Sequence, residues 1–381
     1  MMRRRNVTAA AAAALLVSTG ASFAADLPAT VRTATSADPA LIDKYVADQV
    51  AIIQDKTPKD AKAPGLARDE LARQTDDSKN VAGPKVSAEF KAAYVSAVEK
   101  HVAKLLKSKE VKDRLAAAIV IQKVATATNL PSLEDEILAL LKDESPAVSL
   151  WGMKAARAVI PGVLNLGARL KNQQLTASVV DAVKRNPGVG PLVQDAYAAL
   201  DVSQAQPPVQ AAGINVGTQA ILSLIEVRVG EYVKGMPAAP QADRDAFLYF
   251  ARTAVYQAMQ PADRARAVQE LANLMSVSAQ RLMGQGGDER QKLMDNAKNA
   301  AGAIVSQLRS LPQPPDAAVK AVENISKGLD RLPPAQIPTA IDAAIVAIKA
   351  VPDYKALKDP PTIREATPEP PPAAAANGNA P

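Results

Sequence analysis

A helix-start pattern recurs along the first half of the chain, and it limits the possible folds more than any other feature. The run Leu140-Leu141-Lys142 ends one apolar stretch, and Ser145-Pro146 begins the next after a short acidic turn. The first run has a counterpart 35 residues earlier in Leu105-Leu106-Lys107, and the second has one 41 residues later in Asn186-Pro187. Serine can cap a helix, and proline fits its first turn because the N–H group it lacks has no partner there. Helices that recur at this spacing predict stacked helix pairs, the architecture of an α-solenoid.

The segment 143–159 resembles the start of the second helix in HEAT-type repeats. An acidic turn is followed by Pro146, then by Val148, then by an alanine-rich helix. The position after Val148, usually basic in such repeats, is Ser149 here, and the spacing between copies varies. The resemblance covers residues 100–200 and implies a HEAT-like repeat region at 86–201 that binds other proteins along an extended surface. A helical bundle without repeats is the alternative.

The rest of the sequence also favours helices over strands. Apolar residues recur at three- and four-residue steps, and runs that alternate β-branched with polar residues are absent. The sequence therefore predicts an all-α fold. A second helical region, 214–350, either continues the repeats or forms a separate bundle. The expected helices are 41–54, 66–73, 87–106 and 134–142, and then 217–233, 244–259, 264–283, 288–311, 316–329 and 335–350.

The first 24 residues have the pattern of a secretory signal peptide. Arg3-Arg4-Arg5 precedes a short apolar run, and Ser22-Phe23-Ala24 offers a cleavage site between small residues. We therefore expect export to the periplasm or the extracellular space, with no transmembrane segment after cleavage. Removal of residues 1–24 leaves 42 of the 45 basic residues against 39 acidic ones, so the net charge falls from +6 to +3. So small a positive charge does not predict a nucleic-acid partner.

Two flanking regions differ in composition from the helical part. Residues 25–85 are charged and interrupted by Pro58, Pro64 and Pro84, which predicts an extended lead and a solvated linker with one or two short helices. Residues 351–381 are rich in proline and alanine, which predicts a disordered tail.

Two features of the first half are candidates for an interaction surface. One is a basic stretch without aromatic residues, which could meet phosphates or an anionic surface and could equally be a solvated face. The other is Trp151, the only tryptophan, which could stack on a ligand or fill the core between repeats. The basic residues are Lys104, Lys107, Lys109, Lys112 and Arg114.

Methionines suggest a different surface in the second half. Met259, Met275 and Met283 could line an adaptable groove for a peptide or an apolar ligand, since the thioether side chain is flexible and polarisable. Packing in the helical core is the alternative interpretation.

Cysteine and histidine are almost absent from the chain. The chain has no cysteine, and His101 is its only histidine, placed on an apolar helix face. The acids at 134–136 fall in the first turn of an expected helix, where the helix dipole favours them without any catalytic role. Gly286-Gly287-Asp288-Glu289 resembles the signature of diguanylate cyclases, but Arg290 stands where that family has an aromatic residue, so we interpret it as a helix start. The sequence thus predicts neither an enzyme nor a cofactor or metal site.

The sequence leaves two functions open. The first is an exported, non-enzymatic scaffold that binds a protein partner in the cell envelope, which rests on the repeat pattern. The second is an envelope chaperone or a binding protein for peptides or apolar ligands, which rests on the methionines.

Overall fold

The fold is all-α. The computed structural model describes residues 27–77, 85–167 and 169–363, and these residues form sixteen α-helices and no β-strand. The predicted signal peptide and residues 364–381 of the predicted tail lie outside the described residues. None of the described helices is long and apolar enough to span a membrane.

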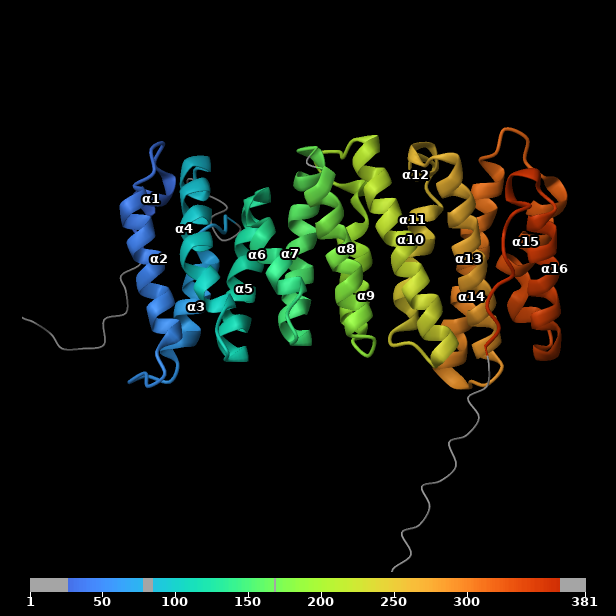
Figure 1. The fold of residues 1–381 in the computed structure, drawn as a ribbon, viewed down its shortest axis with the longest axis horizontal. Coiled ribbons are helices and arrows are strands. Elements are labelled where there is room, and N and C mark those ends of the chain that lie inside the picture. Colours follow the sequence, from blue (N-terminus) through green and yellow to red (C-terminus); the bar gives the residue numbers. More distant parts are fainter. Residues whose placement is uncertain (1–26, 78–84, 168, 364–381) are drawn as a thin grey trace, which may run out of the picture.

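The helices stand side by side in chain order along the long axis of the molecule (Figure 1). Most of them pack against the next helix or the next but one, as α5 packs against α7 and α7 against α9. The first nine are α1 Ala29–Thr33, α2 Pro39–Gln54, α3 Ala63–Arg73, α4 Ala88–Leu106, α5 Val111–Thr128, α6 Glu134–Leu141, α7 Pro146–Asn165, α8 Arg169–Arg185 and α9 Gly190–Leu200. The others are α10 Ala211–Lys234, α11 Arg244–Phe250, α12 Thr253–Ala258, α13 Pro261–Leu282, α14 Gly287–Arg309, α15 Asp316–Gly328 and α16 Ile337–Lys349.

Local sequence signals explain where several helices begin. Ser87 caps α4, because its Oγ accepts a hydrogen bond from the N–H of Phe90 at 3.1 Å, and Asp38 caps α2 in the same way. Pro146 begins α7 as expected, although Ser145 makes no side-chain capping bond. A 3-10 turn at Pro131–Leu133 leads directly into α6.

The expected helix 244–259 is two helices, α11 and α12. Arg252 lies at the break in an extended conformation, at the N-cap position of α12, and its side chain makes no capping bond to that helix. Its guanidinium binds Asp201 at 2.6 and 2.7 Å and Ser203 at 2.6 Å, in the turn after α9. Neither glycine nor proline marks this break, so the helical pattern continues through it in the sequence.

The expected linker and tail both contribute to the helical array. Within the predicted linker, α3 packs against α2 and α5. Leu71 is fully buried because it lies on the apolar face of this helix, opposite the charged face. In the tail, residues 351–363 are ordered against the helices, because Val351 and Tyr354 are buried beside α16 and α13. Residues 78–84 of the linker lie outside the described residues.

A buried polar cluster joins the two predicted halves of the chain. Arg228 of α10 forms an ion pair with Asp243, which ends a 3-10 turn at Pro240–Asp243, and both side chains are 0% exposed. Tyr197 of α9 and Tyr232 of α10 donate hydrogen bonds to the same carboxylate at 3.1 and 2.9 Å. Asn296 of α14 donates to the Tyr232 hydroxyl at 2.9 Å. We call these five residues the Arg228 cluster; it connects α9 to α10 and α14.

The cluster keeps its hydroxyls protonated. Burial first, and then the negative charge of Asp243, raise the pKa of both Tyr197 and Tyr232 well above its ordinary value. Both tyrosines are therefore hydrogen-bond donors to Asp243 throughout the physiological pH range.

Close packing of α6 against α7 predicts a stability effect at Gly152. A Cβ atom there would lie 2.7 Å from Leu140 Cβ and 3.1 Å from the backbone of Leu140 and Leu141. We expect Gly152→Ala to lower the free energy of unfolding by about 1–3 kcal/mol, as overpacking does. The matched control is Gly230→Ala in α10, where no atom lies within 4 Å and the gain in helix propensity is about 0.5–1 kcal/mol. Urea unfolding followed by circular dichroism measures both changes; equal effects would contradict the close packing.

Candidate functional site

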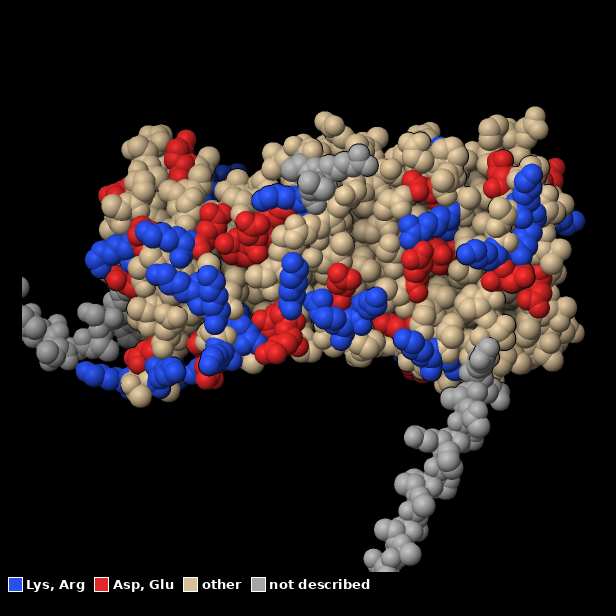
Figure 2. Space-filling view, in the orientation of Figure 1, with Lys and Arg blue, Asp and Glu red and all other residues tan. Residues whose placement is uncertain are grey.

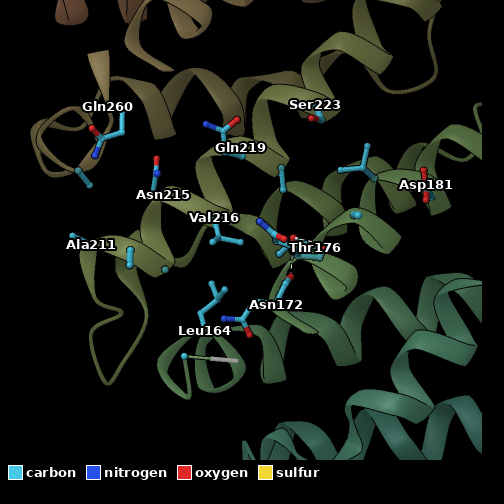
Figure 3. A pocket seen from close by; sticks show the side chains of 18 residues that line it. Leu164, Asn172, Thr176, Asp181, Ala211, Asn215, Val216, Gln219, Ser223 and Gln260 are labelled. Carbon is cyan, nitrogen blue, oxygen red and sulfur yellow. Dashed lines mark hydrogen bonds between the residues drawn. The ribbon is translucent and has the colours of Figure 1, made fainter. Parts of the chain in front are cut away.

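An open cavity of about 1000 Å³ lies between α8 and α10. The end of α7 and the residues before α13 complete its border. Figure 3 shows Asn172, Thr176, Asn215 and Gln219 around this hollow. Its polar lining consists mainly of side-chain amides, and we call it the amide groove. The amides belong to Asn172, Gln173, Asn215, Gln219 and Gln260, and the hydroxyls to Thr176 and Ser223.

Small residues line the groove, and α10 beside it packs closely against α7. Ala177 of α8 and Ala212 of α10 line it and are solvent-exposed. Gly213 permits the close contact of α10 with α7, since a Cβ there would lie 3.2 Å from Leu164 Cβ and 2.5 Å from Val209 Cγ1. The groove is thus a gap between well-packed helices.

The groove carries almost no charge. Asp181 is the only ionisable residue among the described residues that line it. On the face drawn in Figure 2, Lys and Arg side chains are spread along the length of the molecule, with acidic side chains among them. The groove therefore suits a neutral ligand that makes hydrogen bonds better than it suits an ion.

One acceptor in the groove is unsatisfied. The Oδ1 atom of Asn215 is buried and has no hydrogen-bond partner among the described residues. Gln219 is held in place instead, because it donates to Asp263 and accepts from Arg266 Nη1 at 2.9 Å, both of α13. A buried acceptor without a donor costs about 1–3 kcal/mol.

The predicted basic surface is only partly a surface. Lys104, Lys107, Lys109 and Lys112 are exposed. Arg114 is not, and its assignment as an interaction residue is wrong. Its guanidinium is buried because it binds Asp143 at 2.7 and 3.2 Å in the turn between α6 and α7.

The predicted methionine groove is also wrong. Met259 and Met275 are 2% and 0% exposed, because both side chains point into the helical core. Met283 is 45% exposed at the end of α13 but lines none of the described cavities. Trp151 is half-buried against the core, with Lys154 Nζ 5.0 Å from its ring centroid.

The only histidine connects two helices. His101 of α4 is buried, and its Nε2 lies 2.9 Å from Asp43 Oδ1 of α2. Lys100 binds both oxygens of the same carboxylate at 2.9 Å. Hydrogen bonds from Lys100 and then His101 lower the pKa of Asp43. This arrangement supports the interpretation of His101 as a helix-face residue.

Burial determines the direction of the pKa shift of two acidic residues at the start of α6. Burial raises the pKa of Glu134 and Glu136, whereas the helix dipole alone would lower it. The acids that follow Gly286 do begin a helix, α14, as expected. No group of three or more potential metal-ligating side chains occurs among the described residues.

Comparison with protein-family models, with curated proteins and with solved structures gives no match to this chain. Sequence reasoning missed the amide groove because Asn and Gln residues are common on helix surfaces. The available signal was their spacing, since Asn172, Gln173 and Thr176, like Asn215 and Gln219, lie on one face of a helix.

Proposed function

We propose that this protein is an exported, non-enzymatic interaction protein of the cell envelope, with HEAT-like helical repeats as its scaffold. The amide groove between α8 and α10 binds an extended segment of a partner protein. The observation that carries this proposal is the neutral, amide-lined groove between α8 and α10.

The chemistry of the groove matches a peptide main chain. Each side-chain amide offers one donor face and one acceptor, as a peptide bond does. From residue 211 to residue 223 the groove follows α10 for about 18 Å, at about 1.5 Å per residue. An extended segment of five or six residues covers that length at about 3.3 Å per residue.

Other features support the wider proposal. The signal-peptide pattern at residues 1–24 supports export. The starts of α5, α7 and α9 at Val111, Pro146 and Gly190 recur after 35 and 44 residues, which supports a repeat scaffold. Against an enzyme stands the make-up of the groove: its Thr176 hydroxyl donates to the Asn172 carbonyl at 2.9 Å, and Ser223 Oγ accepts from Arg266 Nη2 at 3.2 Å.

The experiment is affinity capture from the cell envelope of the source organism with matched variants. Ala177 is an exposed position of α8 that lines the groove, so Ala177→Arg places a long cation there. We expect this variant to lower the yield of the captured partner at least about tenfold. Ala343→Arg makes the same change at an exposed position of α16, outside the groove, and should capture like the unchanged protein.

The captured partner is then cut into overlapping peptides that are tested for direct binding. A binding peptide that Ala177→Arg weakens and Ala343→Arg does not would establish the groove as the site. Equal capture by both variants would overturn the assignment of the groove. No specific partner for the unchanged protein would overturn the scaffold function.

A further inference from the structure

Residues 357–363 lie extended along α13 on the C-terminal side of the molecule. We call this stretch, Leu-Lys-Asp-Pro-Pro-Thr-Ile, the C-terminal segment. It follows a 3-10 turn at Pro352–Tyr354, whose Tyr354 is buried against the helices. Leu357 and Ile363, at its two ends, are partly buried against the core. The segment has no helical or strand structure of its own.

Two glutamines of α13 bind the main chain of this segment. The Oε1 atom of Gln269 accepts from the N–H of Lys358 at 2.6 Å, and its Nε2 donates to the Lys358 carbonyl at 3.2 Å. Gln280 accepts from the N–H of Ile363 at 2.8 Å and donates to the Pro361 carbonyl at 3.1 Å. Each glutamine thus forms hydrogen bonds with one N–H and one C=O group of the segment, as a neighbouring β-strand would.

The two glutamines are spaced for an extended chain. They lie eleven residues apart on α13, about 16 Å along the helix axis. Lys358 and Ile363 lie five residues apart, about 16 Å in an extended or polyproline II conformation. The distance between the two glutamines along the helix therefore matches the distance between Lys358 and Ile363 along the segment.

Neighbouring side chains of α13 also orient the amide groups of both glutamines. Gln269 Nε2 donates to Asn273 Oδ1 at 2.9 Å, and Gln280 Nε2 donates to Ser276 Oγ at 3.0 Å. These bonds fix the orientation of each amide, so little conformational entropy remains to be lost on binding. We call the four residues the α13 clamp.

We propose that the α13 clamp is a peptide-binding site for extended, proline-containing segments, and that the chain's own C-terminal segment occupies it as a displaceable ligand. The pair Pro360-Pro361 favours the polyproline II conformation in advance, and the clamp reads main-chain groups that any such segment offers. A segment with apolar residues at both ends of a Pro-Pro pair therefore competes for the same site. This site is separate from the amide groove, and its existence does not depend on the proposed function.

The test uses a fluorescent peptide of residues 355–366 and the full chain. Leu357→Ser with Ile363→Ser removes the apolar anchors of the attached segment and leaves α13 unchanged, which opens the clamp. We expect the peptide to bind this open variant and to bind the unchanged chain at least about tenfold more weakly, because the attached segment competes at a millimolar effective concentration. Adding Gln269→Ala and Gln280→Ala to the open variant should weaken binding at least about tenfold. Gln291→Ala, an exposed glutamine of α14, is the matched control and should leave binding unchanged.

Hydrogen exchange on the unchanged chain gives a second readout that needs no altered tail. The amides of Lys358 and Ile363 should be protected, and Gln269→Ala with Gln280→Ala should remove that protection. The proposal is overturned if these amides exchange at the rate of a free peptide. It is also overturned if a folded open variant does not bind the peptide, or binds it equally with and without the two glutamines.

Discussion

Replacing Arg228 with methionine is expected to lower the free energy of unfolding by about 3–5 kcal/mol. The substitution leaves the Asp243 carboxylate buried without its cation, which lies 2.9 Å away from Nε to Oδ1. Arg228 Nη2 also donates to the Ala238 carbonyl at 3.0 Å, and that bond is lost as well. The hydroxyls of Tyr197 and Tyr232 remain, but neutral donors do not balance a buried charge.

Urea unfolding with matched variants measures this effect. Arg309→Met is the control, because Arg309 is exposed and pairs with Glu323 at the surface, where such a pair contributes at most about 1 kcal/mol. Removing both charges, as in Arg228→Met with Asp243→Leu, should recover much of the loss, since no unpaired charge then remains in the core. A loss below about 1 kcal/mol for Arg228→Met would contradict a buried ion pair at the joint between the two halves.

Replacing Arg114 with methionine is expected to lower the free energy of unfolding by about 2–3 kcal/mol, because hydrogen bonds to a charged group are lost in a nearly buried setting. Arg114 of α5 binds Asp143 and also donates to the carbonyls of Ser108 and Lys109 at 3.1 and 3.2 Å. It therefore fixes the turn before α5 and the turn before α7 to one another.

The control for Arg114 lies on the same helix. Lys112→Met removes a charge at an exposed position and should change the free energy of unfolding by less than about 0.5 kcal/mol. Urea denaturation of the two variants measures both changes in the free energy of unfolding. Equal effects would mean that Arg114 acts as a surface cation, as the sequence pattern alone suggested.

The position of Arg114 also relates the sequence pattern to the packing. In the 35-residue register, Arg114 corresponds to Ser149, the position that is usually basic in HEAT-type repeats. In this chain the basic residue stands 35 residues earlier, on α5, and its partner Asp143 lies in the acidic turn between α6 and α7. A surface role was predicted because Arg114 belongs to a stretch with an excess of basic residues, and charge alone does not distinguish a bridge between turns from a solvated face.

Much of the fold could be predicted because helix signals are local. Ser87 caps α4, and Pro146 and Pro261 begin α7 and α13 as proline does in a first turn. The break at Arg252 could not be predicted, because it depends on a contact with Asp201, 51 residues away. The order of the C-terminal segment likewise depends on Gln269, which lies 89 residues from Lys358.

The candidate site could be predicted less well than the fold. A groove depends on the gap that α8 and α10 leave between them, and that gap is set by the packing of Gly213 against α7. The methionines were a poor guide because periodic apolar residues more often fill a core, as Met275 does.

Photo-cross-linking in the living cell tests the central claim, the amide groove as a docking site, most directly. A photoreactive amino acid at Ala177 lies in the groove, and the same amino acid at Ala343 lies outside it. We predict a cross-link to one envelope protein from position 177, through an extended segment of that protein, and none to the same protein from position 343. No cross-link from position 177, or the same cross-link from both positions, would contradict the account.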